Sequence, residues 1–192
     1  MVKSGADAIR DALDNSQAVT VNGTEVNAVS QSFPLDNDKV SSFSSRGIHA
    51  VGNVKPDVTA VGNSIFSAAV GQGSDGISYS GTSMASPMTA GLAALVREAN
   101  PDWTPLQVKA DIMNSAAHDL HPGGAADPGS GTYGPPRVGA GRIDAELATG
   151  NKVLAYDAQN GAVSTSFGPV AASAPMILSR DITVDNQSGS SA

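Results

Sequence analysis

Ser83 stands between two contrasting stretches of sequence, and its hydroxyl is the side chain best placed to act as a nucleophile. Residues 77–80 are short, alternating in polarity and prone to form a β-strand. From Met84 to Ala99, apolar residues recur at steps of one, three and four, a spacing that predicts a helix. We therefore expect a strand that runs directly into a helix, with Ser83 in the first helical turn.

The start of this predicted helix suits nucleophilic chemistry. The first N–H groups of a helix lack partners within it, and the positive end of the helix dipole favours negative charge. A serine at this place can attack a carbonyl carbon while backbone N–H groups, its own included, stabilise the oxyanion. Gly81 lets the chain bend sharply beside a substrate, and Pro87 is expected in the first turn, where no donor is needed.

The body of the helix is expected to be buried on several sides. Gly91 and three neighbouring alanines leave little bulk, so other elements can approach most of the helix surface closely. Only Arg97 and Glu98 have the character of solvated residues. Asn100 followed by Pro101 predicts the helix end.

The stretch Gly81-Thr82-Ser83-Met84-Ala85-Ser86-Pro87 resembles the nucleophile motif of the subtilisin-like serine proteases, the subtilases. Other segments resemble parts of that family in the same order, namely residues 40–47, 55–60, 100–105, 113–116 and 139–145. The resemblance covers residues 38 to 147. It implies an α/β fold: an incomplete subtilisin-like fold, with part of a parallel sheet and a buried central helix, followed by a β-rich tail.

The resemblance also implies a function. Subtilases are serine endopeptidases that hydrolyse peptide bonds in polypeptide substrates through an acyl-enzyme, and Ser83 matches their nucleophile. Their triad comes in the order Asp, His, Ser, and this sequence matches only the third member; the asparagine of the oxyanion hole has no match either. We therefore expect the carboxyl-terminal part of a bacterial hydrolase, inactive alone, whose partner is the missing amino-terminal part of the protease. Missing half its sheet, the fragment is expected to self-associate.

The three histidines do not fit the role of general base. None of His49, His118 and His121 has surroundings that resemble the subtilase histidine motif, so none is expected to be the base. His118 follows the second predicted helix, where a histidine can interact with the negative helix end, and the other two lie in loops. A rival interpretation remains, because Gly81-x-Ser83-x-Ala85 also fits a relaxed nucleophile elbow of an α/β-hydrolase. Asp111 or Asp119 and then His121 follow in the required order, but too few residues separate them for the intervening strands and helices.

Composition excludes several other classes of function. With 192 residues, 40% of them hydrophobic and 15% charged, the chain can bury one sizeable core. A formal charge of −7 argues against nucleic-acid binding, and the absence of cysteine excludes disulfides and thiolate metal sites. We find no apolar run long enough to span a membrane. No cofactor or metal is expected in the chain, although structural calcium in the parent enzyme stays open.

Several local patterns have structural interpretations. Gly71 to Gly76 fits the G-x-G-x-x-G pattern of dinucleotide sites, but a strand rather than a helix is predicted to follow, which indicates a turn. Thr104 and Gln107 have the spacing of a capping box. Trp103 is expected to be a packing residue. Residues 153–156, 162–167 and 176–184 are β-prone.

These features predict three regions. Residues 1–25 resemble the end of a protease-associated insert, with an ordinary catalytic-domain element as the alternative. Residues 26–150 are the carboxyl-terminal part of the subtilase catalytic domain, and residues 151–192 are a linker and the start of a fibronectin-type-III-like domain. This arrangement is typical of secreted or cell-envelope proteases. The alternative function is a non-catalytic binding or structural module of a cell-surface protein.

Overall fold

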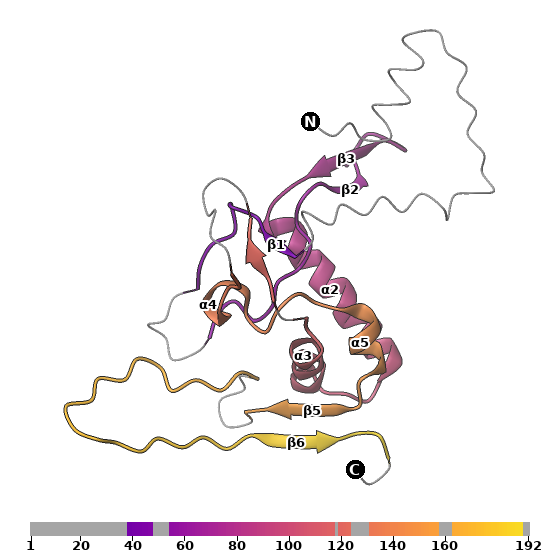
Figure 1. The fold of residues 1–192 in the computed structure, drawn as a ribbon. Helices are drawn as coiled ribbons and strands as arrows, with labels where there is room; N and C mark the ends of the chain where they lie inside the picture. The colour runs from indigo at the N-terminus through magenta and orange to yellow at the C-terminus, as the bar shows by residue number, and fades with distance from the viewer. Residues whose placement is uncertain (1–37, 48–53, 118, 124–130, 158–162, 190–192) are drawn as a thin grey trace. The chain divides into compact units, whose positions relative to one another are not determined.

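The computed structural model describes residues 38–47, 54–117, 119–123, 131–157 and 163–189 (Figure 1). All of these belong to one compact unit, residues 38–192. The predicted region 1–25, together with His49 and His118, lies outside the described residues. The described elements are β1 (Lys39–Val40), β2 (Ile65–Ala68), β3 (Gly76–Tyr79), α2 (Thr82–Ala99), α3 (Pro105–Asn114), β4 (His121–Pro122), α4 (Pro135–Val138), α5 (Ala145–Gly150), β5 (Val153–Tyr156) and β6 (Thr183–Asn186).

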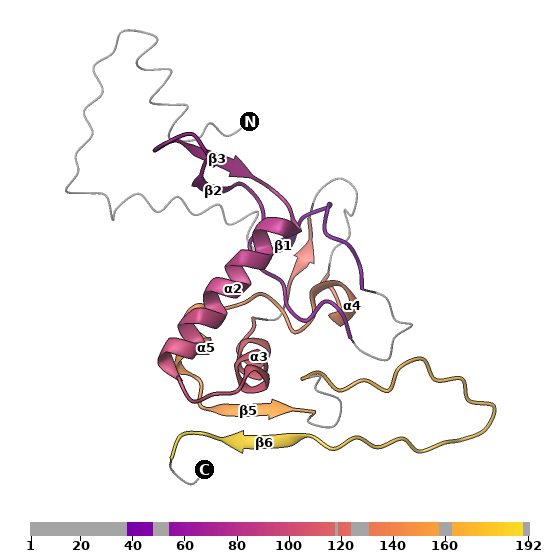
Figure 2. The ribbon, with the colours of Figure 1, turned by 180° about the vertical axis from the view of Figure 1, so that it is seen from behind.

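The described strands form three separate pairs. β1 and β4 are parallel, with Lys39 opposite His121, whereas β2 and β3 form an antiparallel hairpin with Ile65 opposite Tyr79. β5 and β6 are also antiparallel and lie side by side in both views (Figures 1 and 2). This mixture of helices with a small parallel pair agrees with an α/β fold. The glycine-rich residues 71–76 lead into β3, so the expected turn is confirmed.

Three further segments come together around Arg142. This residue forms isolated bridges with Thr59, in parallel, and with Ala117, antiparallel. The Thr59 N–H donates to the Gly141 carbonyl at 2.7 Å, and the Arg142 N–H donates to the Ala117 carbonyl at 2.8 Å. Segments that are far apart in the sequence, and that each resemble part of the subtilase pattern, are therefore adjacent in space.

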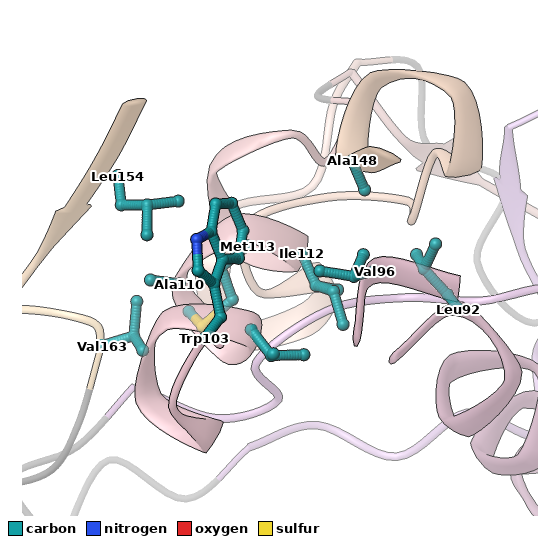
Figure 3. Close-up of a cluster of buried hydrophobic side chains, with 10 residues drawn as sticks. Leu92, Val96, Trp103, Ala110, Ile112, Met113, Ala148, Leu154 and Val163 are labelled. Atoms are coloured by element: carbon teal, nitrogen blue, oxygen red, sulfur yellow. The ribbon is translucent and has the colours of Figure 1, made fainter. Parts of the chain in front are cut away.

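The main core is built largely on α3. Its buried members are Leu92, Val96, Trp103, Val108, Ala110, Ile112, Met113, Ala148, Leu154 and Val163 (Figure 3). The predicted capping box at the start of α3 is confirmed, because the Thr104 side chain accepts from the Gln107 N–H and the Gln107 side chain accepts from the Thr104 N–H. Trp103 is buried within the cluster, as expected for a packing residue.

Helix α2 differs from the prediction in its burial. Only Leu92 and Val96, four residues apart on one face, are buried, while Met88 and Leu95 are 44% and 47% exposed. Helices α3 and α5 pack against α2, and their contact accounts for this single buried face. Within the described part of the chain, the prediction of burial on several sides is therefore wrong, because small side chains permit close packing but do not supply the neighbours.

The place of Pro87 also corrects the prediction. Helix α2 begins at Thr82, so Pro87 lies beyond the first turn and inside the helix. A residue at this place would normally donate its N–H to the carbonyl of Ser83, four residues earlier. Proline cannot do so, and the Ser83 carbonyl therefore lacks its usual helical partner.

The tail contains less strand than predicted. β5 agrees with the expected strand at 153–156, but residues 163–182 contain no strand and β6 begins only at Thr183. A β-prone segment becomes a strand only where a neighbour accepts its backbone hydrogen bonds, and β6 finds that neighbour in β5. None of the described helices is long and apolar enough to cross a membrane.

Candidate active site

The predicted junction of strand and helix around Ser83 is present. β3 leads directly into α2 (Figure 2). β3 ends at Tyr79 and α2 begins at Thr82, so Ser83 is the second residue of an 18-residue helix. Residues 80 and 81 alone separate the strand from the helix. Gly81 occupies the N-cap position with φ of 158° and ψ of 164°, a backbone conformation that favours glycine.

Ser83 is exposed, and its polar groups are uncommitted. Among the described residues, neither its hydroxyl nor its N–H makes a hydrogen bond, and the N–H of Thr82 makes none either. The next two N–H groups, of Met84 and Ala85, donate to the Gly81 carbonyl at 3.0 and 3.4 Å. Because Gly81 has no side chain to cap the helix, two backbone donors remain open beside the Ser83 hydroxyl.

Gly62 braces the turn that carries Ser83. Its carbonyl accepts a 2.7 Å hydrogen bond from the N–H of Gly81. A Cβ atom at position 62 would lie only 2.6 Å from the Gly81 carbonyl oxygen and 3.2 Å from Cβ of Ala85. The close approach therefore requires glycine. The sequence does not indicate this contact, because 18 residues separate Gly62 from Gly81.

The histidine that the structure describes is engaged elsewhere. Nδ1 of His121 lies 2.9 Å from the Gly131 carbonyl oxygen, and its backbone N–H donates to the Asp38 carbonyl at 2.8 Å. No hydrogen bond joins His121 to Ser83 in the described part of the chain. These contacts agree with the expectation that His121 is not the base, whereas the expectations for His49 and His118 stay predictions.

The carboxylates of the rival hydrolase interpretation do not form a triad with His121. Asp111 is fully buried, and its Oδ1 accepts a 2.8 Å hydrogen bond from the side-chain amide of Asn151. Burial raises the pKa of Asp111 to about 6, which the Asn151 bond and nearby Lys152 partly oppose. Neither Asp111 nor Asp119 bonds to His121 among the described residues, so this geometry offers the rival interpretation no support.

Metal ligands do not gather in the residues that the structure describes. In these ranges, no group of three or more His, Asp or Glu side chains could hold a metal ion. The acidic residues make other contacts instead. Asp57, for example, pairs with Lys55 at 2.6 Å and with Lys109 at 3.3 Å.

Comparison with known proteins assigns the chain to a family. The model of the Subtilase family matches residues 6–171, which is most of the chain. The chain belongs to the subtilase family. The family match ends beyond residue 150, and the boundaries proposed for the three regions stay predictions.

Three relatives show how large a part of a longer subtilase this chain matches. Serine protease AprX of Bacillus subtilis is 38% identical over 112 residues, covering 52% of this chain and 25% of AprX. C5a peptidase of Streptococcus pyogenes is 35% identical over 130 residues, or 64% of this chain and 10% of that protein. Subtilisin-like protease SBT3.16 of Arabidopsis thaliana is 41% identical over 80 residues, or 41% of this chain and 10% of that protein. The matched parts thus span between a tenth and a quarter of these relatives.

Proposed function

We propose that this subtilase chain supplies Ser83 as the nucleophile of a serine endopeptidase. The observation that carries the proposal is the exposed Ser83 hydroxyl on the second residue of α2. Beside it lie two backbone N–H groups that make no hydrogen bond within the described ranges. An anion that forms there meets hydrogen-bond donors and the positive end of the helix dipole. Membership in the subtilase family supports polypeptides as the substrate class.

The proposed reaction is the acyl-enzyme chemistry of serine endopeptidases. Oγ of Ser83 attacks the scissile carbonyl carbon while a histidine base takes the hydroxyl proton. The oxyanion of the tetrahedral intermediate accepts a hydrogen bond from the Ser83 N–H. The C–N bond then breaks, the histidine gives its proton to the departing amine, and water hydrolyses the acyl-enzyme by the same steps.

Ser83 needs partners for this chemistry. A general base must come within hydrogen-bond reach of the hydroxyl, and the described part of the chain brings no histidine there. The proposed partner is the amino-terminal part of a subtilase, which supplies the Asp, the His and the oxyanion asparagine. The isolated chain is then at most a trace peptidase. We further propose that the parent protease is secreted or attached to the cell envelope, with no cofactor in this chain.

The test compares the chain alone with the chain joined to a subtilase segment that bears the Asp, His and Asn, here called the reconstituted protease. Casein hydrolysis and labelling by a fluorophosphonate probe are measured in both. The reconstituted protease should be active and labelled at Ser83, and Ser83→Ala should abolish both signals. Ser86→Ala is the matched control, because Ser86 is an exposed serine of the same helix.

Two outcomes would overturn the proposal. Robust hydrolysis by the isolated chain, lost in Ser83→Ala, would show that the chain activates Ser83 by itself. Unchanged activity and labelling of Ser83→Ala in the reconstituted protease would exclude Ser83 as the nucleophile. The alternative, a non-catalytic binding or structural module, would then be favoured.

A further inference from the structure

Ser80, three residues before Ser83, ties the end of β3 to the segment that precedes β2. Its hydroxyl accepts a 2.8 Å hydrogen bond from the Ser64 N–H. The same hydroxyl donates a 2.8 Å hydrogen bond to Oδ1 of Asn63. A single side chain thus uses both of its hydrogen-bonding roles on two consecutive residues of another segment.

The backbone of Ser64 needs such a contact. Its φ of 54° lies in the left-handed region, which is unfavourable for a residue with a side chain. The hydrogen bond from the Ser64 N–H to Ser80 therefore helps to hold a backbone conformation that would otherwise relax. Strained residues of this kind persist only where their surroundings hold them, and they gather at functional sites.

The same segment also touches the residues on both sides of Ser83. The Gly62 carbonyl accepts the hydrogen bond from the Gly81 N–H, and Gly62 also lies against Ala85, two residues after Ser83 in α2. Residues 62–64 therefore contact positions 80 and 81 before the nucleophile and position 85 after it. A shift of this segment would change the direction in which Ser83 presents its hydroxyl and N–H.

We propose that Ser80 and Asn63 form a positioning pair that fixes the turn carrying the nucleophile. The pair acts through Ser64 and Gly81 rather than by contact with Ser83. The proposal rests on the proposed role of Ser83. Because a misplaced nucleophile reacts slowly even when substrate binds normally, the pair governs kcat more than KM.

Exposure of the pair separates positioning from folding. Ser80 and Asn63 are both exposed, so water can replace either hydrogen bond when a side chain is removed. The removal therefore costs little stability. What it loses is the single, fixed geometry of the turn, on which orientation in catalysis depends.

The activity test uses the reconstituted protease. Ser80→Ala and Asn63→Ala should each lower kcat about tenfold while KM changes less than about twofold, a loss typical of imprecise orientation. Ser80→Thr keeps the hydroxyl and should restore most of kcat. The double variant should lose little more than either single variant, because the two side chains form one unit. Ser78→Ala is the matched control, since Ser78 lies two residues earlier and is also exposed.

A second measurement is independent of activity. Amide hydrogen exchange of this chain should show a faster-exchanging Gly81 amide in Ser80→Ala, with the amides around Val96 unchanged. If Ser83→Ala stays active, the proposed function fails, but the exchange rate of the Gly81 amide still tests whether Ser80 and Asn63 fix the turn. If Ser83→Ala is inactive while Ser80→Ala keeps the kcat and the Gly81 exchange rate of the unaltered chain, the positioning pair alone is overturned.

Discussion

Asn151 donates its side-chain amide to Oδ1 of Asp111 at 2.8 Å, while Oδ2 of the same carboxyl group is buried and has no hydrogen-bond partner among the described residues. Lys152 lies near, but its ammonium group donates to Oδ1 of Asn100 and lies 5.5 Å from the centroid of the Trp103 ring. These interactions thus offset only part of the cost of burying the charged Asp111 carboxylate. Desolvation dominates, and it raises the pKa of Asp111 from 3.8 to about 6.

Asp111 should make the free energy of unfolding depend on pH. Its pKa in the folded chain, about 6, exceeds the unfolded value of 3.8, so its stabilising contribution is complete below pH 3.8 and disappears as pH rises through 6. Between pH 4 and pH 8 the unaltered chain should lose up to about 3 kcal/mol relative to Asp111→Asn, which cannot ionise. Urea denaturation of both proteins across this range measures the difference. Parallel curves would show that burial does not disfavour the charged form.

Gly62→Ala tests the brace beneath the nucleophile turn. The added methyl group would collide with the Gly81 carbonyl oxygen and press on Ala85, so the turn must shift. We expect a loss of about 1–3 kcal/mol in the free energy of unfolding, as for other overpacked sites. Activity of the reconstituted protease should fall as well, because the shift displaces Ser83.

Gly91→Ala is the matched control for this substitution. A Cβ atom at Gly91 meets nothing within 4 Å in the part of the chain that the structure describes, and the residue lies inside helix α2. Alanine should therefore stabilise the chain by about 0.5–1 kcal/mol through its higher helix propensity. Thermal unfolding measures both variants. Equal effects of the two substitutions would show that the contact of Gly62 with Gly81 is not tight.

Local features of the sequence predicted local structure well. The start of α2 close to Ser83 follows from a short alternating segment next to a helical spacing, and the Thr104 cap follows from residues three apart. The glycines of residues 71–76 could be assigned to a turn because the mechanism of a dinucleotide site requires a helix directly after them. Each of these inferences needs only neighbouring residues, so tertiary structure had little opportunity to overturn it.

Features that depend on distant partners could not be predicted. The contact of Gly62 with Gly81 and the hydrogen bonds of Ser80 with Asn63 join segments that the sequence separates. The burial of α2 depends on which elements pack against it, and the residue types of the helix do not determine those neighbours. Pro87 was expected in the first turn of the helix. Its true place depends on which residue begins the helix, and the hydrophobic spacing does not fix that boundary to a single residue.

Exposed apolar side chains on α2 and on the hairpin predict self-association of the isolated chain. Met88 and Leu95 lie seven residues apart on one face of α2, and Phe66 in β2 is 74% exposed. Burying such surface in a second copy is favourable, so the apparent mass should rise with concentration in light scattering. Leu95→Gln should weaken association, whereas Arg97→Gln, a change on the same helix that leaves the apolar face intact, should not. A monodisperse monomer at all concentrations would contradict this.

Asn114 provides a final test, because its side-chain amide serves β5 as a neighbouring strand would. Nδ2 donates to the Ala155 carbonyl at 3.1 Å, and Oδ1 accepts from the Ala155 N–H at 2.7 Å. Asn114→Ala removes both bonds and should lower the free energy of unfolding by about 1–2 kcal/mol, measured by urea denaturation. Asn114→Asp keeps the acceptor but loses the donor, so its stability should lie between the two. If Asn114→Ala left both the stability and the hydrogen exchange of Ala155 unchanged, α3 would hold β5 by apolar packing alone, through the fully buried Leu154.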